Sequence, residues 1–168
     1  MRYAFYISPD ETDPLTAAAE RWLGAYPFTG ATHELQPAGD FSAGDLTALT
    51  ADPRRYGFHG TLKAPFALAP GVGEQQLLDT FDAFAGERTS FDIPKIVLGQ
   101  LGPFFALVPE ADCPPLQDLA DETVRRFSPF RAPLSDADIA RRKPETLGSV
   151  MRSNLLEWGY PYVFESFR

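Results

Sequence analysis

The chain has 168 residues, one cysteine and two histidines, and its formal net charge at pH 7 is -8. This length predicts one domain, or two small lobes that share a core, with enough buried apolar surface to fold without cross-links. A single cysteine excludes an intramolecular disulfide, and with only two histidines there is no zinc site of nitrogen and sulfur ligands, so we expect no metal. The negative charge argues against binding a long nucleic acid but permits a small phosphorylated ligand.

The first residues lack the apolar segment and cleavage site of a signal peptide, and no later segment reaches membrane-spanning length. We therefore expect a cytoplasmic protein that does not contact a membrane.

The first elements are predicted from side-chain pattern and turn signals. Residues 2–7 are rich in aromatic and β-branched side chains and predict a strand, which ends at the turn residues 8–10. A helix follows, with Asp13 as its cap and Pro14 in its first turn. Trp22 lies on the apolar stripe of this helix and is expected in the core.

Residues 28–53 are rich in Gly, Pro, Thr and Asp and predict a long loop region with one short helical turn near Leu46. His33 lies in this region without a recognisable site around it, and we interpret it as an ordinary surface histidine. A central strand follows and ends near Pro65.

The second half of the chain alternates helices and strands. Apolar spacing and capping signals predict helices over residues 74–86, 114–127, 135–142 and 145–158. Residues 91–101 and 103–108 predict a hairpin, and the aromatic residues 160–167 predict a final strand. This order predicts an α+β fold with mainly antiparallel sheet.

The central strand carries a candidate site. Side chains two apart share a face of a strand, so His59, Thr61 and Lys63 are expected to point the same way. An imidazole, a hydroxyl and an ammonium group in a row suit a phosphate oxyanion, although a lone histidine on a strand is often structural. Lys63 could bind the phosphate or extend to solvent. Residues 71–73 lack the third glycine of a nucleotide-binding loop, so we expect no nucleotide cofactor.

The stretch Tyr56-Gly57-Phe58-His59-Gly60-Thr61-Leu62-Lys63-Ala64-Pro65-Phe66 resembles the His-x-Thr signature of the 2H phosphoesterase superfamily. Residues 2–6, residues 101–109 and the segment Trp158-Gly159-Tyr160-Pro161-Tyr162-Val163-Phe164-Glu165 resemble one branch of it, a group encoded beside phosphonate-degradation genes.

This resemblance implies a bilobal fold in which mainly antiparallel sheets and flanking helices surround a central cleft, with residues 1–168 forming one domain of two pseudo-symmetric lobes. Each lobe is expected to contribute one His-x-Thr or His-x-Ser motif. Only the motif of His59 and Thr61 is present. The resemblance places the second on a strand that begins at residues 164–168, just past Arg168, so we expect the second lobe to be incomplete.

The resemblance also implies residue roles. His59 would act as a general acid or a general base, and which of the two is left open. Thr61 would hydrogen-bond the non-bridging phosphate oxygens. Tyr3, Tyr160 and Tyr162 are candidates for substrate binding around the cleft, with core or rim packing as the alternative for each.

The resulting prediction is a metal-independent phosphoesterase without a cofactor, acting on a small cyclic phosphate such as a ribosyl cyclic phosphate from phosphonate breakdown. The alternatives are a module that binds a phosphorylated metabolite or an RNA end without turnover, and a structural partner of other phosphonate-pathway proteins that carries a large apolar patch. We expect a monomer or a weak dimer, because an incomplete lobe leaves sheet edges unpaired.

Overall fold

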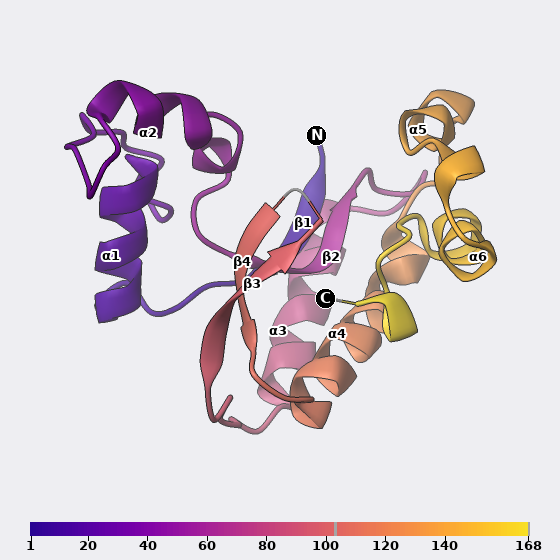
Figure 1. Cartoon of the computed structure of the whole chain (residues 1–168). Helices are drawn as coiled ribbons and strands as arrows, with labels where there is room; N and C mark the ends of the chain where they lie inside the picture. Colours follow the sequence, from indigo (N-terminus) through magenta and orange to yellow (C-terminus); the bar gives the residue numbers. More distant parts are fainter. Residues whose placement is uncertain (103, 168) are drawn as a thin grey trace. The chain divides into compact units, whose positions relative to one another are not determined.

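The computed structural model describes residues 1–102 and 104–167 (Figure 1). Strand β1 pairs with β2 and β3 pairs with β4, which gives two two-stranded sheets accompanied by helices. The predicted α+β class is confirmed. In chain order the elements are β1 (Tyr3–Ile7), α1 (Pro14–Leu23), α2 (Ala43–Leu49), β2 (Gly60–Phe66), α3 (Glu74–Gly86), β3 (Ile96–Leu101), β4 (Phe104–Pro109), α4 (Pro114–Phe127), α5 (Asp136–Arg141) and α6 (Ser149–Trp158).

The chain divides into two compact units. Unit 1 consists of Met1–Phe5 and Leu62–Arg168, and unit 2 consists of Tyr6–Thr61. The division passes through both β1 and β2, so each unit holds one part of each strand. Of the candidate site residues, His59 and Thr61 therefore belong to unit 2, whereas Lys63 and the three tyrosines belong to unit 1.

In unit 2 the predicted start of the first helix is confirmed. The Asp13 side chain accepts a hydrogen bond from the backbone N–H of Leu15, and Pro14 is the first residue of α1. Trp22 was expected in the core, and this prediction was wrong, because its side chain is 45% exposed and meets Phe41 edge to face. Its neighbour Leu23 is buried instead. Consecutive helix residues are about 100° apart around the axis, so only one of the two faces the interior.

Aromatic rings form the core of unit 1. Phe127, on α4, has no exposed surface, and its ring centroid lies 4.1 Å from that of Phe5 and 5.4 Å from that of Phe84. The ring centroid of Phe130 lies 5.9 Å from that of Phe127. Rings of this size contribute much of the apolar area that a small core buries, so Phe127 ties β1, α3 and α4 together.

The predicted hairpin is confirmed, with β3 antiparallel to β4 from the Ile96–Pro109 pair to the Leu101–Phe104 pair. Its first strand is shorter than residues 91–101, since it begins at Ile96, and Pro103 lies outside the described residues. Three large apolar side chains of the hairpin are 70% exposed or more: Leu98, Phe104 and Phe105. The hairpin therefore leaves apolar side chains in contact with solvent.

The final strand predicted over residues 160–167 was wrong. Phe164–Ser166 forms a short 3-10 helix, and Phe164 has a positive φ of 53°. Two backbone carbonyl oxygens that could pair with a neighbouring strand instead accept hydrogen bonds from side chains. The Asn154 amide donates to the carbonyl of Val163, and the Gln117 amide donates to the carbonyl of Phe164. Arg168, where the expected second motif strand continues, lies outside the described residues.

The helix predicted over residues 145–158 is also shorter, because α6 begins at Ser149 after a separate 3-10 turn, and it ends as predicted at Gly159. Within residues 1–102 and 104–167, none of the helices combines the length and apolar character needed to cross a bilayer.

Candidate functional site

His59 is held in a defined orientation by the loop before β2. Its Nδ1 atom lies 2.9 Å from the carbonyl oxygen of Gly57. A carbonyl oxygen can only accept, so in the neutral ring we assign the hydrogen to Nδ1 and the lone pair to Nε2. The imidazole packs on Tyr6, with ring centroids 4.0 Å apart, and lies near Tyr56 at 6.2 Å. The Nδ1 contact therefore fixes the position of the ring, and Nε2 has no hydrogen-bond partner in the described part of the chain.

The loop conformation depends on a glycine. Gly57 has a φ of 71°, and a Cβ placed on it would lie 2.6 Å from the Cβ of Pro27. Both the left-handed backbone and the close approach favour a residue without a side chain. Ser8 adds a second constraint, because its hydroxyl donates to the carbonyl oxygen of Phe58 at 3.1 Å. Together these contacts position the residue that precedes β2.

Thr61 is the second residue of β2 and is partly exposed. Within residues 1–102 and 104–167 its hydroxyl has no hydrogen-bond partner, which leaves it able to donate to a ligand. His59 itself stands one residue before the first residue of β2. The shared face that strand alternation predicts for the two residues therefore stays a prediction.

A cavity in unit 2 lies next to this loop. It has a volume of about 270 Å³, and its lining includes Arg54, Arg55, Tyr56 and Gly57. Arg54 is occupied structurally, since it donates to the Leu23 carbonyl at 2.8 Å. His59 is not among the lining residues of this cavity.

Unit 1 holds a second cavity of about 40 Å³, lined by polar and apolar residues that include Lys63. Lys63 is 4% exposed, so the alternative in which it extends to solvent was wrong. Its ammonium group donates to the Ser128 hydroxyl at 3.1 Å and to the Val124 carbonyl at 3.3 Å. Burial, followed by repulsion from the nearby Arg131, lowers the pKa of Lys63 to about 8.

Arg131 lines the same cavity and is a second, partly buried cation there. It donates to the carbonyl oxygens of Ala132 at 2.8 Å and of Glu157 at 3.1 Å. Its Nε atom is buried without a hydrogen-bond partner in the described part of the chain. Gly159, with a φ of 84°, allows this packing, because a Cβ there would lie 2.8 Å from Nε. Burial lowers the pKa of Arg131.

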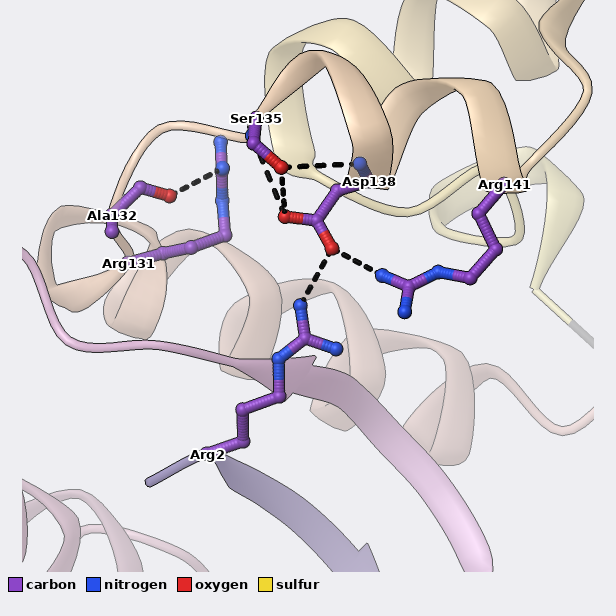
Figure 2. A network of polar contacts seen from close by, with 6 residues as sticks. All are labelled: Arg2, Arg131, Ala132, Ser135, Asp138 and Arg141. Atoms are coloured by element: carbon purple, nitrogen blue, oxygen red, sulfur yellow. Dashed lines mark hydrogen bonds and ion pairs between the residues drawn. The ribbon is translucent and has the colours of Figure 1, made fainter.

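Asp138 is the carboxylate at this cavity and is already engaged (Figure 2). It accepts from the Ser135 hydroxyl at 2.8 Å and from Arg2 at 2.8 Å, and it also pairs with Arg141. The Ser135 bond, with Arg2 adding to it, holds the pKa of Asp138 below its usual value. Sequence reasoning missed Arg2, Arg131 and Asp138 as site residues. The Ser135-x-x-Asp138 capping box was the one local signal that could have indicated Asp138.

The three candidate tyrosines are not gathered in one place. Tyr160 lines the cavity of unit 1, and burial raises its pKa. Its ring meets that of Tyr162 at 5.5 Å, and the Arg142 guanidinium lies 4.8 Å from its centroid. Tyr162 is 44% exposed. Tyr3 donates to the sulfur of Met1 at 3.2 Å, and neither Tyr3 nor Tyr162 lines the cavity.

Acidic, cysteine and histidine side chains are the residues of this chain that could bind a metal ion. In the described residues no group of three or more of them is placed to hold a metal ion.

Residues 61–168 match a family described as "Protein of unknown function (DUF1045)". This match includes Thr61, Lys63 and Arg131, while His59 lies two residues before it. The chain is also similar to two curated proteins that are both called "Ribose 1,5-bisphosphate phosphokinase PhnN".

The first, from Janthinobacterium sp. (strain Marseille), is 35% identical over 167 residues, covering 99% of this chain and 37% of the relative. The second, from Laribacter hongkongensis (strain HLHK9), is 32% identical over 176 residues, covering 100% of this chain and 38% of the relative. The chain thus spans less than two fifths of these relatives, and no solved structure matches it. Because the family match covers more than half of its length, the chain belongs to the family described as "Protein of unknown function (DUF1045)".

Proposed function

We propose that the chain acts in phosphonate metabolism as a metal-independent phosphoesterase that opens a small cyclic phosphate, such as a ribosyl cyclic phosphate. The observation that carries this proposal is the hydrogen bond between His59 Nδ1 and the Gly57 carbonyl, 2.9 Å long. It leaves Nε2 for proton transfer, and histidine is a common general acid or base. Thr61, two residues later, supplies a hydroxyl with no internal partner in the described part of the chain.

The names of the similar proteins support a phosphorylated ribose as the class of ligand. We do not extend the phosphokinase activity in those names to this chain. Its sequence contains no G-x-x-x-x-G-K-[S/T] loop, the usual backbone cradle for the phosphates of ATP. Most of the length of both relatives also lies outside the matched region.

The reaction needs two proton transfers. Water attacks phosphorus, one phosphorus–oxygen ester bond of the ring breaks, and a phosphate monoester results. A base takes a proton from the water, and an acid gives a proton to the leaving oxygen. His59 serves as the base when Nε2 is unprotonated and as the acid when the ring is protonated. A hydrogen bond from Thr61 to a non-bridging oxygen, whose charge grows in the transition state, is worth on the order of a few kcal/mol.

The test compares the two histidines of the chain. Wild type, His59→Ala and His33→Ala are incubated with a ribosyl cyclic phosphate and with 2′,3′-cyclic nucleotides, and the monoester product is followed by phosphorus NMR. His33 is the matched control, since it is partly exposed and its ring nitrogen lies 3.7 Å from Glu20. We expect hydrolysis to fall by about 100-fold or more in His59→Ala and to be unchanged in His33→Ala. Equal hydrolysis by both variants would overturn the proposal.

A second candidate function is a module that binds the same phosphorylated ligand without turnover. The presence of a single His-x-Thr motif in the sequence favours it, because the reaction needs two proton-transfer groups. Titration calorimetry with the cyclic phosphate distinguishes the two functions. Binding of an intact ligand that phosphorus NMR shows to remain cyclic supports the binding module, and release of monoester supports the enzyme.

A further inference from the structure

We propose that the cavity of unit 1 lined by Lys63 and Arg131 is a binding site for a phosphate group. This site uses neither His59 nor Thr61, so it does not depend on the proposed reaction. Its recognition chemistry is the buried ammonium group of Lys63 and the partly buried guanidinium group of Arg131, with their unused N–H donors. These groups suit the doubly charged oxyanion of inorganic phosphate or of a phosphate monoester.

The ammonium charge of Lys63 is not compensated by a carboxylate in the described part of the chain. Its side chain is 4% exposed, and within residues 1–102 and 104–167 no carboxylate pairs with its ammonium group. The two acceptors that it has, the Ser128 hydroxyl and the Val124 carbonyl, are neutral. An ammonium group carries three hydrogens, so one donor has no hydrogen-bond acceptor. Its other recorded contact is with the apolar Phe66 ring, whose centroid lies 5.5 Å from Nζ. Buried charges in proteins are normally paired, and an anion in the cavity would supply the pair.

Arg131 is the second cation of the cavity that lacks an anionic partner among the described residues. Its guanidinium has five N–H donors, and its described partners are the backbone carbonyls of Ala132 and Glu157. Its Nε is buried without a partner, and no ion pair involves Arg131 in the described residues. Two like charges that line one cavity without a shared anion repel each other, and the low pKa of Lys63 reflects that repulsion in part.

The carboxylate of Asp138 does not neutralise these two cations. It is shared by Arg2 and Arg141, and it also caps α5 through Ser135 (Figure 2). One negative charge therefore already faces two guanidinium groups. Among the charged residues that line the cavity, Arg2, Lys63 and Arg131 outnumber Asp138, so the cavity has an excess of positive charge.

The size of the cavity fits a phosphate group rather than a whole phosphorylated metabolite. A buried water needs roughly 10–15 Å³, so a volume of about 40 Å³ has room for about three waters or one tetrahedral oxyanion. A sugar or a base would have to remain outside. We therefore expect a terminal phosphate to enter the cavity while the rest of its molecule stays at the surface.

The test is titration calorimetry of the full chain with inorganic phosphate, repeated in two buffers of different ionisation enthalpy. We expect one phosphate per chain and, at pH 8, uptake of up to about half a proton, since a bound anion raises the pKa of Lys63. Lys63→Met keeps the shape of the side chain and removes its charge, and Lys95→Met removes an exposed lysine paired with Glu110. Affinity should fall about tenfold or more in Lys63→Met, with loss of proton uptake, and stay unchanged in Lys95→Met.

Three outcomes would overturn the site: no binding by wild type, a Lys63→Met affinity within about twofold of wild type, or acetate binding as tightly as phosphate. If Lys63→Met does not fold, amide NMR of the wild type decides instead. Shifts on adding phosphate should concentrate at Lys63, Ala132 and Gly159, and shifts spread evenly over the chain would count against the site. His59→Ala should keep phosphate binding, so failure of the phosphoesterase proposal and failure of this one are separate results.

Discussion

The Nδ1 atom of His59 lies 2.9 Å from the carbonyl oxygen of Gly57, and this contact sets the orientation of the imidazole ring in the central motif. The contact in turn depends on a backbone conformation that a side chain at position 57 would oppose, since φ there is 71°. The histidine of the motif and the glycine two residues before it therefore act as one structural unit.

Replacement of Gly57 by alanine should destabilise the fold more than replacement of Gly30 does. Both residues have a φ near 70°, but a Cβ at Gly30 meets no atom within 4 Å, whereas one at Gly57 meets Pro27 at 2.6 Å. We expect a loss of about 1–2 kcal/mol in the free energy of unfolding for Gly30→Ala and about 2 kcal/mol more for Gly57→Ala. Urea denaturation of both variants measures this, and equal losses would show that the Pro27 contact relaxes without cost.

The buried Lys63 should make stability depend on pH above neutrality. Its pKa is about 8 in the folded chain and about 10.5 in the unfolded chain, so between these pH values the unfolded chain keeps the proton of Lys63 and the folded chain loses it. Stability should therefore rise relative to Lys63→Met as pH increases from about 8 to about 10.5, by on the order of 3 kcal/mol. Chemical denaturation at a series of pH values checks this prediction. A difference between the two proteins that stays constant with pH would contradict it.

Truncation of Phe127 should be among the most damaging single changes in unit 1. The ring is fully buried and contacts Phe5, Phe84 and Phe130, so alanine leaves a cavity among aromatic rings. We expect a loss of about 3–5 kcal/mol in unfolding free energy. Phe104→Ala is the control, because that ring is 70% exposed, and it should change stability by less than about 1 kcal/mol. Thermal and urea unfolding of both variants provide the measurement.

Asp138→Asn should lower stability near neutral pH and lose its effect in acid. The pKa of Asp138 is held below its usual value by Ser135 and Arg2, so its contribution is present above the pKa of about 4 in the unfolded chain. The contribution disappears as pH falls through the lower folded pKa. Asp136→Asn, on the same helix but outside this network, is the control variant. The comparison requires unfolding curves between pH 2 and 7, and parallel curves for wild type and Asp138→Asn would refute it.

Much of the fold was predictable because its signals are local. The start of α1 depends on Asp13 and Pro14, the start of α5 on Ser135 and Asp138, and the hairpin on apolar runs separated by a short turn. Each of these signals acts over a few residues, so the sequence alone carries it.

The sequence predictions that were wrong depend on contacts between residues that are distant in the sequence. Trp22 and Leu23 have similar local signals, and only packing decides which one is buried. Residues 160–167 have the composition of a strand, but the side chain of Gln117 takes the carbonyl of Phe164. Lys63 and Arg131 line the same cavity although they are far apart in sequence, and no sequence motif indicates that they lie together. The shared role of His59 and Thr61 stays a prediction.

The β3–β4 hairpin has a consequence for the motions of the chain. Among the described strands, β3 and β4 pair with each other alone, while Leu98, Phe104 and Phe105 remain largely exposed. A two-stranded hairpin without a buried face is marginally stable in water. Its amide hydrogens should therefore exchange with solvent by local opening, long before those of α4 around Phe127, which require global unfolding. Protease cleavage under native conditions should begin in the same place.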